Sequence, residues 1–350
     1  MAEPPLEQLR SQIDALNSDL LTLLNERLRL VEEVQEVKAA TGRPLFDPAR
    51  ESLELQALLL ENSGPMTADQ VRGIFKEVFK LSLGHMQQET RRTLHVHRGD
   101  QPDSVYTIAG HRFGAEPQLI AGPCSVESPE QVHAVAGKLA GLGVRFMRGG
   151  AYKPRTSPYS FQGLGIEGLK MLREAADAHG MAVVSEILDP RHLEAALEYS
   201  DVLQVGTRNM YNYELLKLLG RTDKPIMLKR GFMATLEEFV LAAEYIAHEG
   251  NEQIILCERG IRTHEKWTRN TLDLAAIPLL RIETPFPVVV DVAHGTGRKD
   301  LMIPMAKAAF AAGAQGVMVE VHPDPALALS DNAQQMNFDE FEAFVGAVLG

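Results

Sequence analysis

Residues 226–257 read IMLKRGFMATLEEFVLAAEYIAHEGNEQIILC, and this stretch decides the fold class. Two short apolar runs, at 226–228 and 254–257, enclose a polar loop and a helical stretch. Strands that are apolar without alternation are typical of parallel sheets, because both faces of such strands are buried. The stretch therefore predicts two parallel strands joined by a helix.

The same unit recurs from residue 119 onward. Helical stretches separate most of the apolar strand cores, which lie at 119–121, 144–147, 182–185, 202–205, 226–228, 254–257, 288–292 and 317–319. Eight such units close naturally into a (β/α)₈ TIM barrel. The alternative is a doubly wound open sheet, which is disfavoured because no GxGxxG follows the first strand.

Three helices are predicted ahead of the barrel. The first spans residues 3–39, because apolar residues recur at alternating spacings of three and four. These residues are Leu6, Leu9, Ile13, Leu16, Leu20 and Leu23. Asp47-Pro48 is a typical helix start and begins a second helix that runs to about 61, and a third spans about 67–88. We therefore divide the chain into an all-α domain (1–90), a polar linker (91–104) and a barrel domain (105–350).

Composition excludes several classes of protein. The 350 residues carry a formal net charge of −12, whereas nucleic-acid binding requires an excess of Lys and Arg. No apolar run approaches the roughly 20 residues that span a bilayer. The start MAEPPLEQLR lacks the features of a signal peptide, and two cysteines make no disulfide framework. We expect a cytoplasmic protein that binds neither nucleic acid nor membrane.

Chemically distinctive residues stand at the C-terminal ends of the predicted strands. In chain order they are Cys124, Arg148, Glu186, Arg208, Lys229, Arg259, His294 and Glu320. Barrel enzymes place their chemistry at this end of the strands, so the pattern predicts an active site at one mouth. The alternative for any one of them is a capping or salt-bridging group.

These residues, with neighbours, form two sets. Cys124, His294, Glu320 and Asp331 offer a thiolate, an imidazole and carboxylates, which suit Mn, Fe, Co or Zn. No local spacing such as CxxC supports a metal site, so a buried cysteine and a hydrogen-bonded histidine remain the alternative.

The second set is cationic and consists of Arg148, Lys153, Arg155, Arg208, Lys229 and Arg259. Arg side chains match phosphate and carboxylate geometry, and Thr156 and Ser157 add hydroxyl donors. In an acidic protein such a set indicates a multiply anionic ligand, although some members could be rim ion pairs.

Seven motifs of the barrel region stand in a recognisable order and spacing: AGPCSVES (121–128), RGGAYKPRTSPYSFQGLG (148–165), VGTRN (205–209), LKRG (228–231), ILCERGIRT (255–263), DVAHGTGR (291–298) and EVHPDPALALSDNAQQM (320–336). In these motifs the chain resembles 3-deoxy-D-arabino-heptulosonate 7-phosphate (DAHP) synthases, in the shorter bacterial branch of type I that carries a chorismate mutase-like domain. The resemblance implies condensation of phosphoenolpyruvate with erythrose 4-phosphate, assisted by a divalent metal, with Mn expected first.

The resemblance also implies roles for single residues. It makes Cys124, His294, Glu320 and Asp331 the metal ligands, and it makes Lys153, with Cys124 and His294, catalytic. Phosphoenolpyruvate would be bound by Arg148, Lys153, Arg208, Lys229 and Arg259, and erythrose 4-phosphate by Arg155, Thr156 and Ser157. A related synthase that uses arabinose 5-phosphate has an Asn-Arg-Ser-Ser type run where this chain has Pro154-Arg155-Thr156-Ser157. That synthase, or another metal-dependent phosphosugar aldolase, is the alternative.

The helical domain resembles the all-helical chorismate mutases, which are intertwined dimers. The positions that match the family's dicarboxylate-binding residues are Arg10, Arg27, Lys38, Asp47, Arg50 and Glu51. Arg10 lies about 25 Å before Arg27 along the helix, so a second chain must supply one cation if all of them bind one ligand. We expect a homo-oligomer: a dimer through this domain and a tetramer overall.

One residue of the third helix departs from the mutase pattern. Met86 stands where the family has Gln or Glu beside the substrate ether oxygen, and Met cannot donate a hydrogen bond. The domain is therefore either a mutase or purely a sensor that binds chorismate or prephenate and regulates the barrel.

Overall fold

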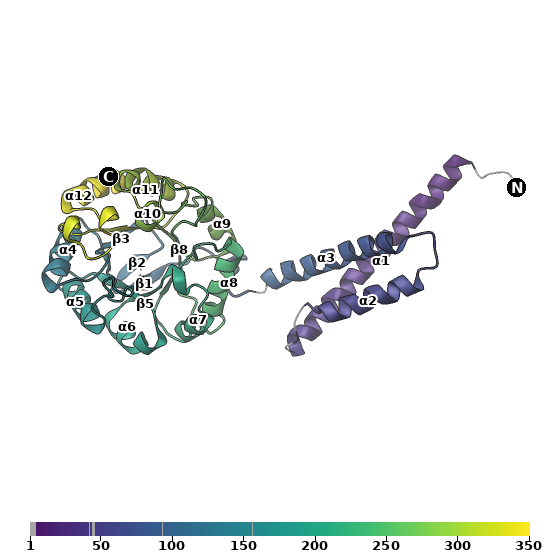
Figure 1. Ribbon diagram of the computed structural model, residues 1–350, viewed down its shortest axis with the longest axis horizontal. Helices are drawn as coiled ribbons and strands as arrows, with labels where there is room; N and C mark the ends of the chain where they lie inside the picture. Colours follow the sequence, from purple (N-terminus) through teal and green to yellow (C-terminus); the bar gives the residue numbers. More distant parts are fainter. Residues whose placement is uncertain (1–4, 42, 44–45, 93, 156) are drawn as a thin grey trace. The chain divides into compact units, whose positions relative to one another are not determined.

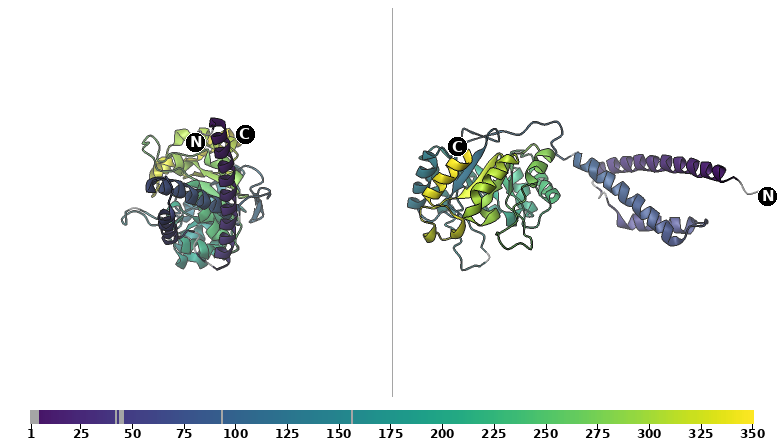
Figure 2. Two further views of the ribbon diagram at one scale, coloured as in Figure 1. Left: turned by 90° about the vertical axis from the view of Figure 1, so that its right-hand side faces the viewer. Right: turned by 90° about the horizontal axis from the view of Figure 1, so that it is seen from above.

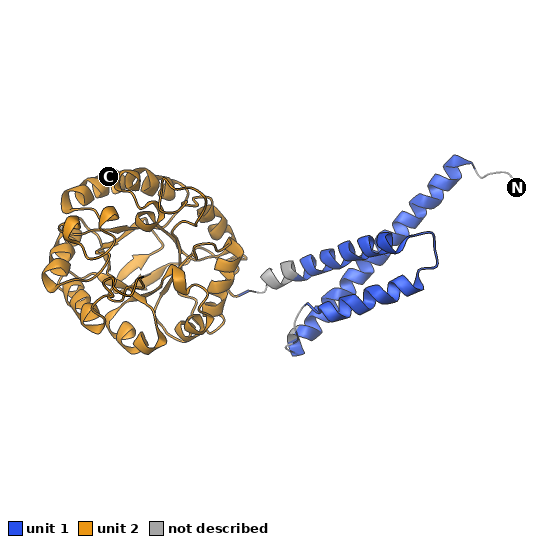
Figure 3. Cartoon of the chain, viewed as in Figure 1, with its two compact units in different colours: residues 1–94 blue, residues 95–350 orange. Residues whose placement is uncertain are grey.

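The structure is a computed structural model that describes residues 5–41, 43, 46–92, 94–155 and 157–350, with only the backbone for 39 and 87–92. The chain forms two compact units, Met1–Leu94 and His95–Gly350 (Figure 3). The residues from His95 to 104, within the predicted linker, belong to the second unit.

Unit 2 is a closed barrel of eight parallel strands, which confirms the predicted fold class (Figure 1). The strands are β3 (Gln118–Gly122), β4 (Phe146–Arg148), β5 (Ala182–Ile187), β6 (Val202–Val205), β7 (Ile226–Lys229), β8 (Ile254–Glu258), β9 (Val288–Asp291) and β10 (Gly316–Glu320). The last strand pairs with the first, from Gly316↔Gln118 to Glu320↔Gly122. Closure therefore brings the C-terminal ends of all eight strands to one mouth.

A ring of helices covers the outside of the barrel (Figures 1 and 2). They are α4 (Pro129–Gly141), α5 (Ile166–Asp177), α6 (Leu193–Tyr199), α7 (Tyr213–Gly220), α8 (Leu236–Ala247), α9 (Ala276–Glu283), α11 (Met302–Ala311) and α12 (Phe338–Leu349). The short helix α10 (Val292–Thr296) lies inside this ring, directly after β9.

The helix in the stretch that predicted the fold, α8, illustrates how the ring forms. Thr235 and Glu238 make a reciprocal capping box, with bonds of 3.1 and 2.8 Å between side chains and backbone N–H groups. Phe239 and Ile246 lie on the face that is buried against the barrel. Full burial of a side chain such as Phe239 contributes about 1.5–3 kcal/mol.

At two places the predicted strand core extends beyond the observed strand. Val144 was predicted to begin a strand, but its N–H donates to the Leu139 carbonyl in the turn after α4, so β4 begins at Phe146. Val292 was predicted to end a strand, but it begins α10, because Asp291 caps that helix by accepting from the His294 N–H.

A hairpin that the sequence did not predict covers the end of the barrel opposite the mouth. It consists of β1 (Tyr106–Ile108) and β2 (His111–Phe113). Phe113 packs edge-on against Phe146 with ring centroids 5.0 Å apart, and the Tyr106 hydroxyl donates to the Ile254 carbonyl at 3.0 Å. The floor of the barrel is therefore closed, and ligands must enter by the mouth.

Unit 1 consists of the three predicted helices α1 (Leu6–Thr41), α2 (Pro48–Glu61) and α3 (Ala68–Arg92). Figure 2 shows α1 as one continuous helix. Asp47 caps α2 by accepting from the Arg50 N–H at 3.1 Å. The apolar stripe of α1 is exposed at Leu6, Leu9, Ile13, Leu16, Leu20 and Leu23. Among the described residues, no helix is long and apolar enough to cross a membrane.

Candidate active site

Cys124 follows β3 in a tight loop that depends on glycine. Gly122 has φ of +152°, and a Cβ atom on it would lie 1.9 Å from the Arg148 carbonyl oxygen. The close approach of β3 and β4 places Cys124 just beyond the strand, where its N–H donates to Gln335 Oε1 at 3.1 Å.

Four side chains from distant parts of the chain meet at this point. One ligand atom from each of Cys124, His294, Glu320 and Asp331 lies within 4.8 Å of the others. His294 Nε2 is 3.5 Å from Glu320 Oε1 and 3.6 Å from Asp331 Oδ2. Asp331 has a left-handed backbone (φ 40°, ψ 43°), a costly conformation for a residue other than glycine. The structure thus brings together all four predicted ligands.

His294 is oriented by the buried carboxylate of Asp291. Asp291 Oδ2 contacts His294 Nδ1 at 2.8 Å and accepts from Lys229 Nζ at 2.5 Å. Burial opposes ionisation of Asp291, but His294 and Lys229 outweigh burial and hold its pKa well below the ordinary value. A carboxylate that fixes the ring in this way is the usual partner of a metal-binding histidine.

Glu320 is held ionised in the interior. It accepts from Arg148 Nη1 and from Gln334 Nε2, both at 2.5 Å. Burial alone would raise the pKa of Glu320, but His294, Arg148 and Lys153 lower it to about 2. The carboxylate is therefore available as a ligand at neutral pH.

Cys124 is the buried thiol of the cluster. Burial, together with Glu320, raises its pKa to about 11. Lys153 Nζ lies 3.1 Å from its Sγ and 2.9 Å from its carbonyl oxygen. A thiol, an imidazole and two carboxylates fit a borderline divalent ion, and binding of the ion would displace the thiol proton.

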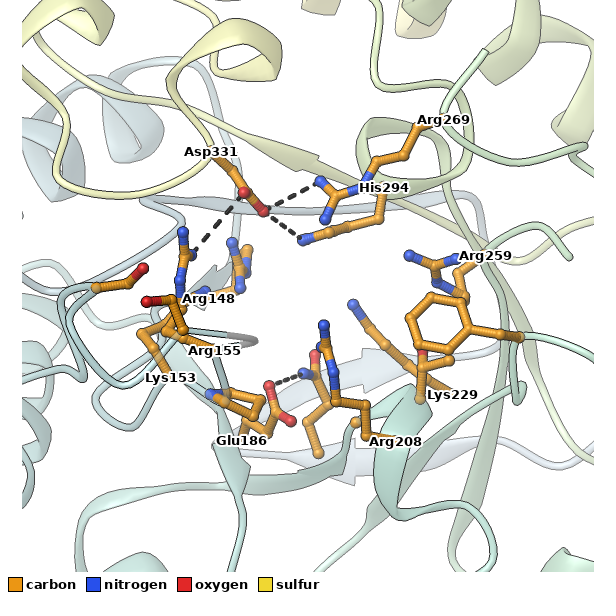
Figure 4. A pocket seen from close by; sticks show the side chains of 17 residues that line it. Arg148, Lys153, Arg155, Glu186, Arg208, Lys229, Arg259, Arg269, His294 and Asp331 are labelled. Atoms are coloured by element: carbon orange, nitrogen blue, oxygen red, sulfur yellow. Dashed lines mark hydrogen bonds and ion pairs between the residues drawn. The ribbon is translucent and has the colours of Figure 1, made fainter. Parts of the chain in front are cut away.

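A strongly cationic pocket opens beside this cluster (Figure 4). Of the described residues that line it, seven are cationic and two are carboxylates. The cations are Arg148, Lys153, Arg155, Arg208, Lys229, Arg259 and Arg269. The charged ends of Arg208, Lys229 and Arg259 point toward the open middle of the pocket. A protein with net charge −12 concentrates positive charge here, which fits a multiply anionic ligand.

Of the remaining predicted residues of the mouth that the structure describes, two line the pocket. Ser157 lines the pocket with Arg155, whereas Thr156 lies outside the described residues. Glu186 is the second carboxylate of the pocket, and Gln204 Nε2 donates to it at 3.4 Å.

Phe232 and Arg269 are among the pocket residues that sequence reasoning missed. Phe232 lies among three guanidinium groups. The distance from the centre of its ring to the guanidinium carbon Cζ is 5.5 Å for Arg208, 4.7 Å for Arg259 and 4.4 Å for Arg262. Such contacts hold cations by the negative face of the ring. Arg269 donates to Asp331 at 3.1 Å. Phe232 directly follows the LKRG run, and this adjacency was the available signal.

Unit 1 has a pocket of its own. Five of the six residues that resemble mutase positions line it, namely Arg27, Lys38, Asp47, Arg50 and Glu51. Arg10 does not line this pocket and pairs with Glu7 at 2.8 Å.

Met86 also lines the pocket of unit 1, where it is buried. The Arg27 guanidinium donates to the Ser82 hydroxyl at 2.5 Å and lies 5.4 Å from the centre of the Phe79 ring. The cationic end of Arg27 is therefore fixed in place within the pocket.

Comparison with known proteins identifies both units. Residues 101–348 match the model of the DAHP synthetase I family. The chain belongs to the DAHP synthetase I family. Residues 9–87 of this family member match the chorismate mutase type II model. The chain is therefore an enzyme of DAHP synthesis with a chorismate mutase type II domain at its N-terminal end.

Relatives agree with the family assignment. A phospho-2-dehydro-3-deoxyheptonate aldolase of Thermotoga maritima is 57% identical over 227 residues, which are 65% of this chain and 67% of that protein. A 2-dehydro-3-deoxyphosphooctonate aldolase of Syntrophotalea carbinolica is 33% identical over 259 residues, 68% of this chain and 92% of that protein.

A crystal structure of a DAHP synthase from Thermotoga maritima matches with a TM-score of 0.70 and 53% identity, and covers 72% of this chain and 74% of that one. A truncated form of the Thermotoga maritima synthase matches with a TM-score of 0.67 and 49% identity, over 72% of this chain and 93% of that chain.

Proposed function

We propose that the barrel condenses phosphoenolpyruvate with erythrose 4-phosphate and water to give DAHP and phosphate. The strongest support is that the ligand cluster and the cations share one cavity. His294 and Asp331 line the same cavity as Arg208 and Lys229. The reaction requires both parts, because two phosphorylated substrates must be neutralised and one carbonyl must be activated.

The two substrates would bind to different sets of side chains. Phosphoenolpyruvate would be held by Arg148, Lys153, Arg208, Lys229 and Arg259, and erythrose 4-phosphate by Arg155, Thr156 and Ser157. Arg155 Nη1 is 3.9 Å from Asp331 Oδ1. A phosphate bound at Arg155 and Ser157 would therefore direct the aldehyde end of the sugar toward the ligand cluster.

Cys124, His294, Glu320 and Asp331 would hold a divalent ion, Mn²⁺ first and Fe²⁺, Co²⁺ or Zn²⁺ as alternatives, whose chemistry is to polarise the aldehyde oxygen. The C3 carbon of phosphoenolpyruvate forms a bond to the aldehyde carbon, water adds at C2, and phosphate leaves from C2. Lys153, beside Cys124, would protonate the former aldehyde oxygen, which then becomes the new hydroxyl group. Arg208, Lys229 and Arg259 would stabilise the phosphate and carboxylate charges throughout.

Release of phosphate from phosphoenolpyruvate tests the proposal. We expect rapid release with erythrose 4-phosphate and at least about tenfold slower release with arabinose 5-phosphate, because the KPRTS run differs from the Asn-Arg-Ser-Ser type run of the related synthase. Faster release with arabinose 5-phosphate would favour the alternative. Exhaustive chelation should abolish turnover, and Mn²⁺ should restore it. Full activity without metal would contradict the assignment of the cluster.

We further propose that unit 1 binds chorismate or prephenate and regulates the barrel as a homo-oligomer, dimeric through α1 and tetrameric overall. The pocket around Arg27, Lys38 and Arg50 supports a dicarboxylate ligand. Because Arg10 does not line this pocket, a second copy of the chain would supply it. The buried Met86 favours a sensor over a mutase, since its thioether donates no hydrogen bond.

Two variants separate the sensor from the mutase. We expect Met86→Gln to consume chorismate at least about tenfold faster than the wild-type chain, because the amide supplies the missing donor. Removal of residues 1–90 should abolish inhibition of DAHP formation by prephenate. Inhibition that persists in the truncated barrel would exclude the sensor role. Coupling must be reciprocal, so an inhibitor that weakens substrate binding must itself bind less tightly when substrate is bound.

A further inference from the structure

A second group of metal-binding side chains lies in unit 2, apart from the mouth. It consists of His95, Glu244 and His248. His95 is the first residue of unit 2, Glu244 lies in the last turn of α8, and His248 is its C-cap residue. Because α8 runs back from the mouth to the start of β8, this group lies at the opposite end of the barrel from Cys124.

The geometry of the three side chains converges. Glu244 and His248 are four residues apart and share one face of the helix. The His95 and His248 rings are edge-on with centroids 5.7 Å apart. Val96, which is fully buried, donates its N–H to Glu244 Oε2 at 3.1 Å and so holds His95 over the helix.

The ligand atoms are within reach of a single ion. One atom from each residue lies within 4.8 Å of the others. Ligands at about 2.0–2.1 Å from a tetrahedral ion lie roughly 3.4 Å apart, so a side-chain movement of about 1 Å closes the site. His95 and His248 are exposed and Glu244 is half-buried, so the side chains have room for this movement.

We propose that His95, Glu244 and His248 form a second divalent-metal site, suited to Zn²⁺. Two imidazoles and one carboxylate make a three-ligand tetrahedral set that leaves one position for water. Imidazole ligands favour Zn²⁺, Co²⁺, Ni²⁺ and Cu²⁺ over the harder Mg²⁺ and Mn²⁺. The bound ion ties the segment where unit 2 begins to α8. This inference does not depend on the reaction at the mouth.

Titration of the full-length chain with Co²⁺ tests the site. The thiolate of Cys124 marks the first site by an intense sulfur-to-metal absorption band, whereas the second site has no sulfur ligand. We expect the His248→Gln chain to bind one Co²⁺ fewer than the wild-type chain and to retain the sulfur band. His133→Gln, at an exposed histidine on α4, is the matched control and should bind as many ions as the wild-type chain.

A second set of variants, in which the proposed active-site metal ligands are changed, distinguishes metal binding at this site from metal binding at the mouth. Cys124→Ser combined with His294→Ala, which removes two proposed ligands of the first site, should still bind one Co²⁺ through the histidine group, and Zn²⁺ should raise its melting temperature. Adding His248→Gln or His95→Gln to this double variant should remove both effects. Equal Co²⁺ stoichiometry of the wild-type and His248→Gln chains, or a Zn²⁺ shift that survives both histidine changes, would overturn the proposal.

Discussion

At the scale of single residues, the two cysteines show how position decides chemistry. Both thiols are buried, and burial raises the pKa of Cys124 to about 11 and that of Cys257 to about 12. Cys257 lies within β8, paired in register with Lys229, and packs in the barrel core. Cys124 lies one loop beyond its strand, among His294, Glu320 and Asp331.

This difference leads to a paired prediction. Loss of a residue that only supports a metal ligand lowers metal affinity roughly 10–100-fold. Because Cys124 is proposed as a direct ligand, Cys124→Ser should weaken Mn²⁺ binding by at least that much. Cys257→Ser should leave Mn²⁺ affinity within about twofold and lower stability modestly, since a hydroxyl replaces a packed thiol. Titration with Mn²⁺ and thermal melting measure both. Equal loss of affinity in the two variants would mean that Cys124 acts only as a core residue.

At the scale of elements, the segment before β1 is held against α9 and against the loop that follows α9. The Arg98 N–H donates to the Glu283 carbonyl and the Ser104 N–H to the Pro285 carbonyl, both at 2.8 Å. Asp103 joins Arg98 at 2.5 Å and Arg281 at 2.6 Å. Burial opposes ionisation of Asp103, but the two guanidinium groups outweigh burial and lower its pKa.

The lowered pKa predicts a pH-dependent contribution of Asp103 to stability. The contribution is fully present above the ordinary carboxyl pKa of 3.8 and is lost as the pH falls through the lower folded value. Asp103→Asn should therefore lower the melting temperature by about 1–3 °C at pH 7, since the group is partly exposed, and by less in strong acid. Asp100→Asn, at an exposed neighbour, is the control. A deficit that does not change with pH would contradict the ion-pair explanation.

At the scale of the whole molecule, the exposed stripe of α1 fits the proposed dimer, in which a second copy of the chain would cover it. Leu16 is 66% and Leu20 55% exposed on a helix of 36 residues. A contiguous apolar surface of this kind marks an interaction site. Arg10 lies on the same helix, outside the pocket of its own chain.

Leu16→Glu combined with Leu20→Glu should disrupt this interface. We expect the mass in solution to fall to that of a smaller assembly, because charges replace apolar contacts. Prephenate affinity should fall at least about tenfold, because Arg10 of the proposed second copy would no longer reach the pocket. Analytical ultracentrifugation and calorimetry are the measurements. Leu60→Glu, on α2 with 88% exposure, is the matched control. An unchanged mass in the double variant would exclude α1 as the interface.

Much of the molecule follows from the sequence alone. The fold class was predictable because most of the units carry the same local pattern, an apolar run followed by a helical stretch, and eight such units close naturally into a barrel. The proposed ligands Cys124, His294 and Glu320 stand at strand ends for the same reason. Because the barrel closes, residues that follow successive strands along the chain lie next to one another at the mouth.

Tertiary structure decided what no local pattern encodes. The β1–β2 hairpin has strands of three residues, too short to show a period. The sharing of Asp291 between Lys229 and His294, and the position of Phe232 among three guanidinium groups, depend on distances between side chains of separate elements. Such distances are set by packing around the closed barrel, and the order of residues along the chain does not contain them.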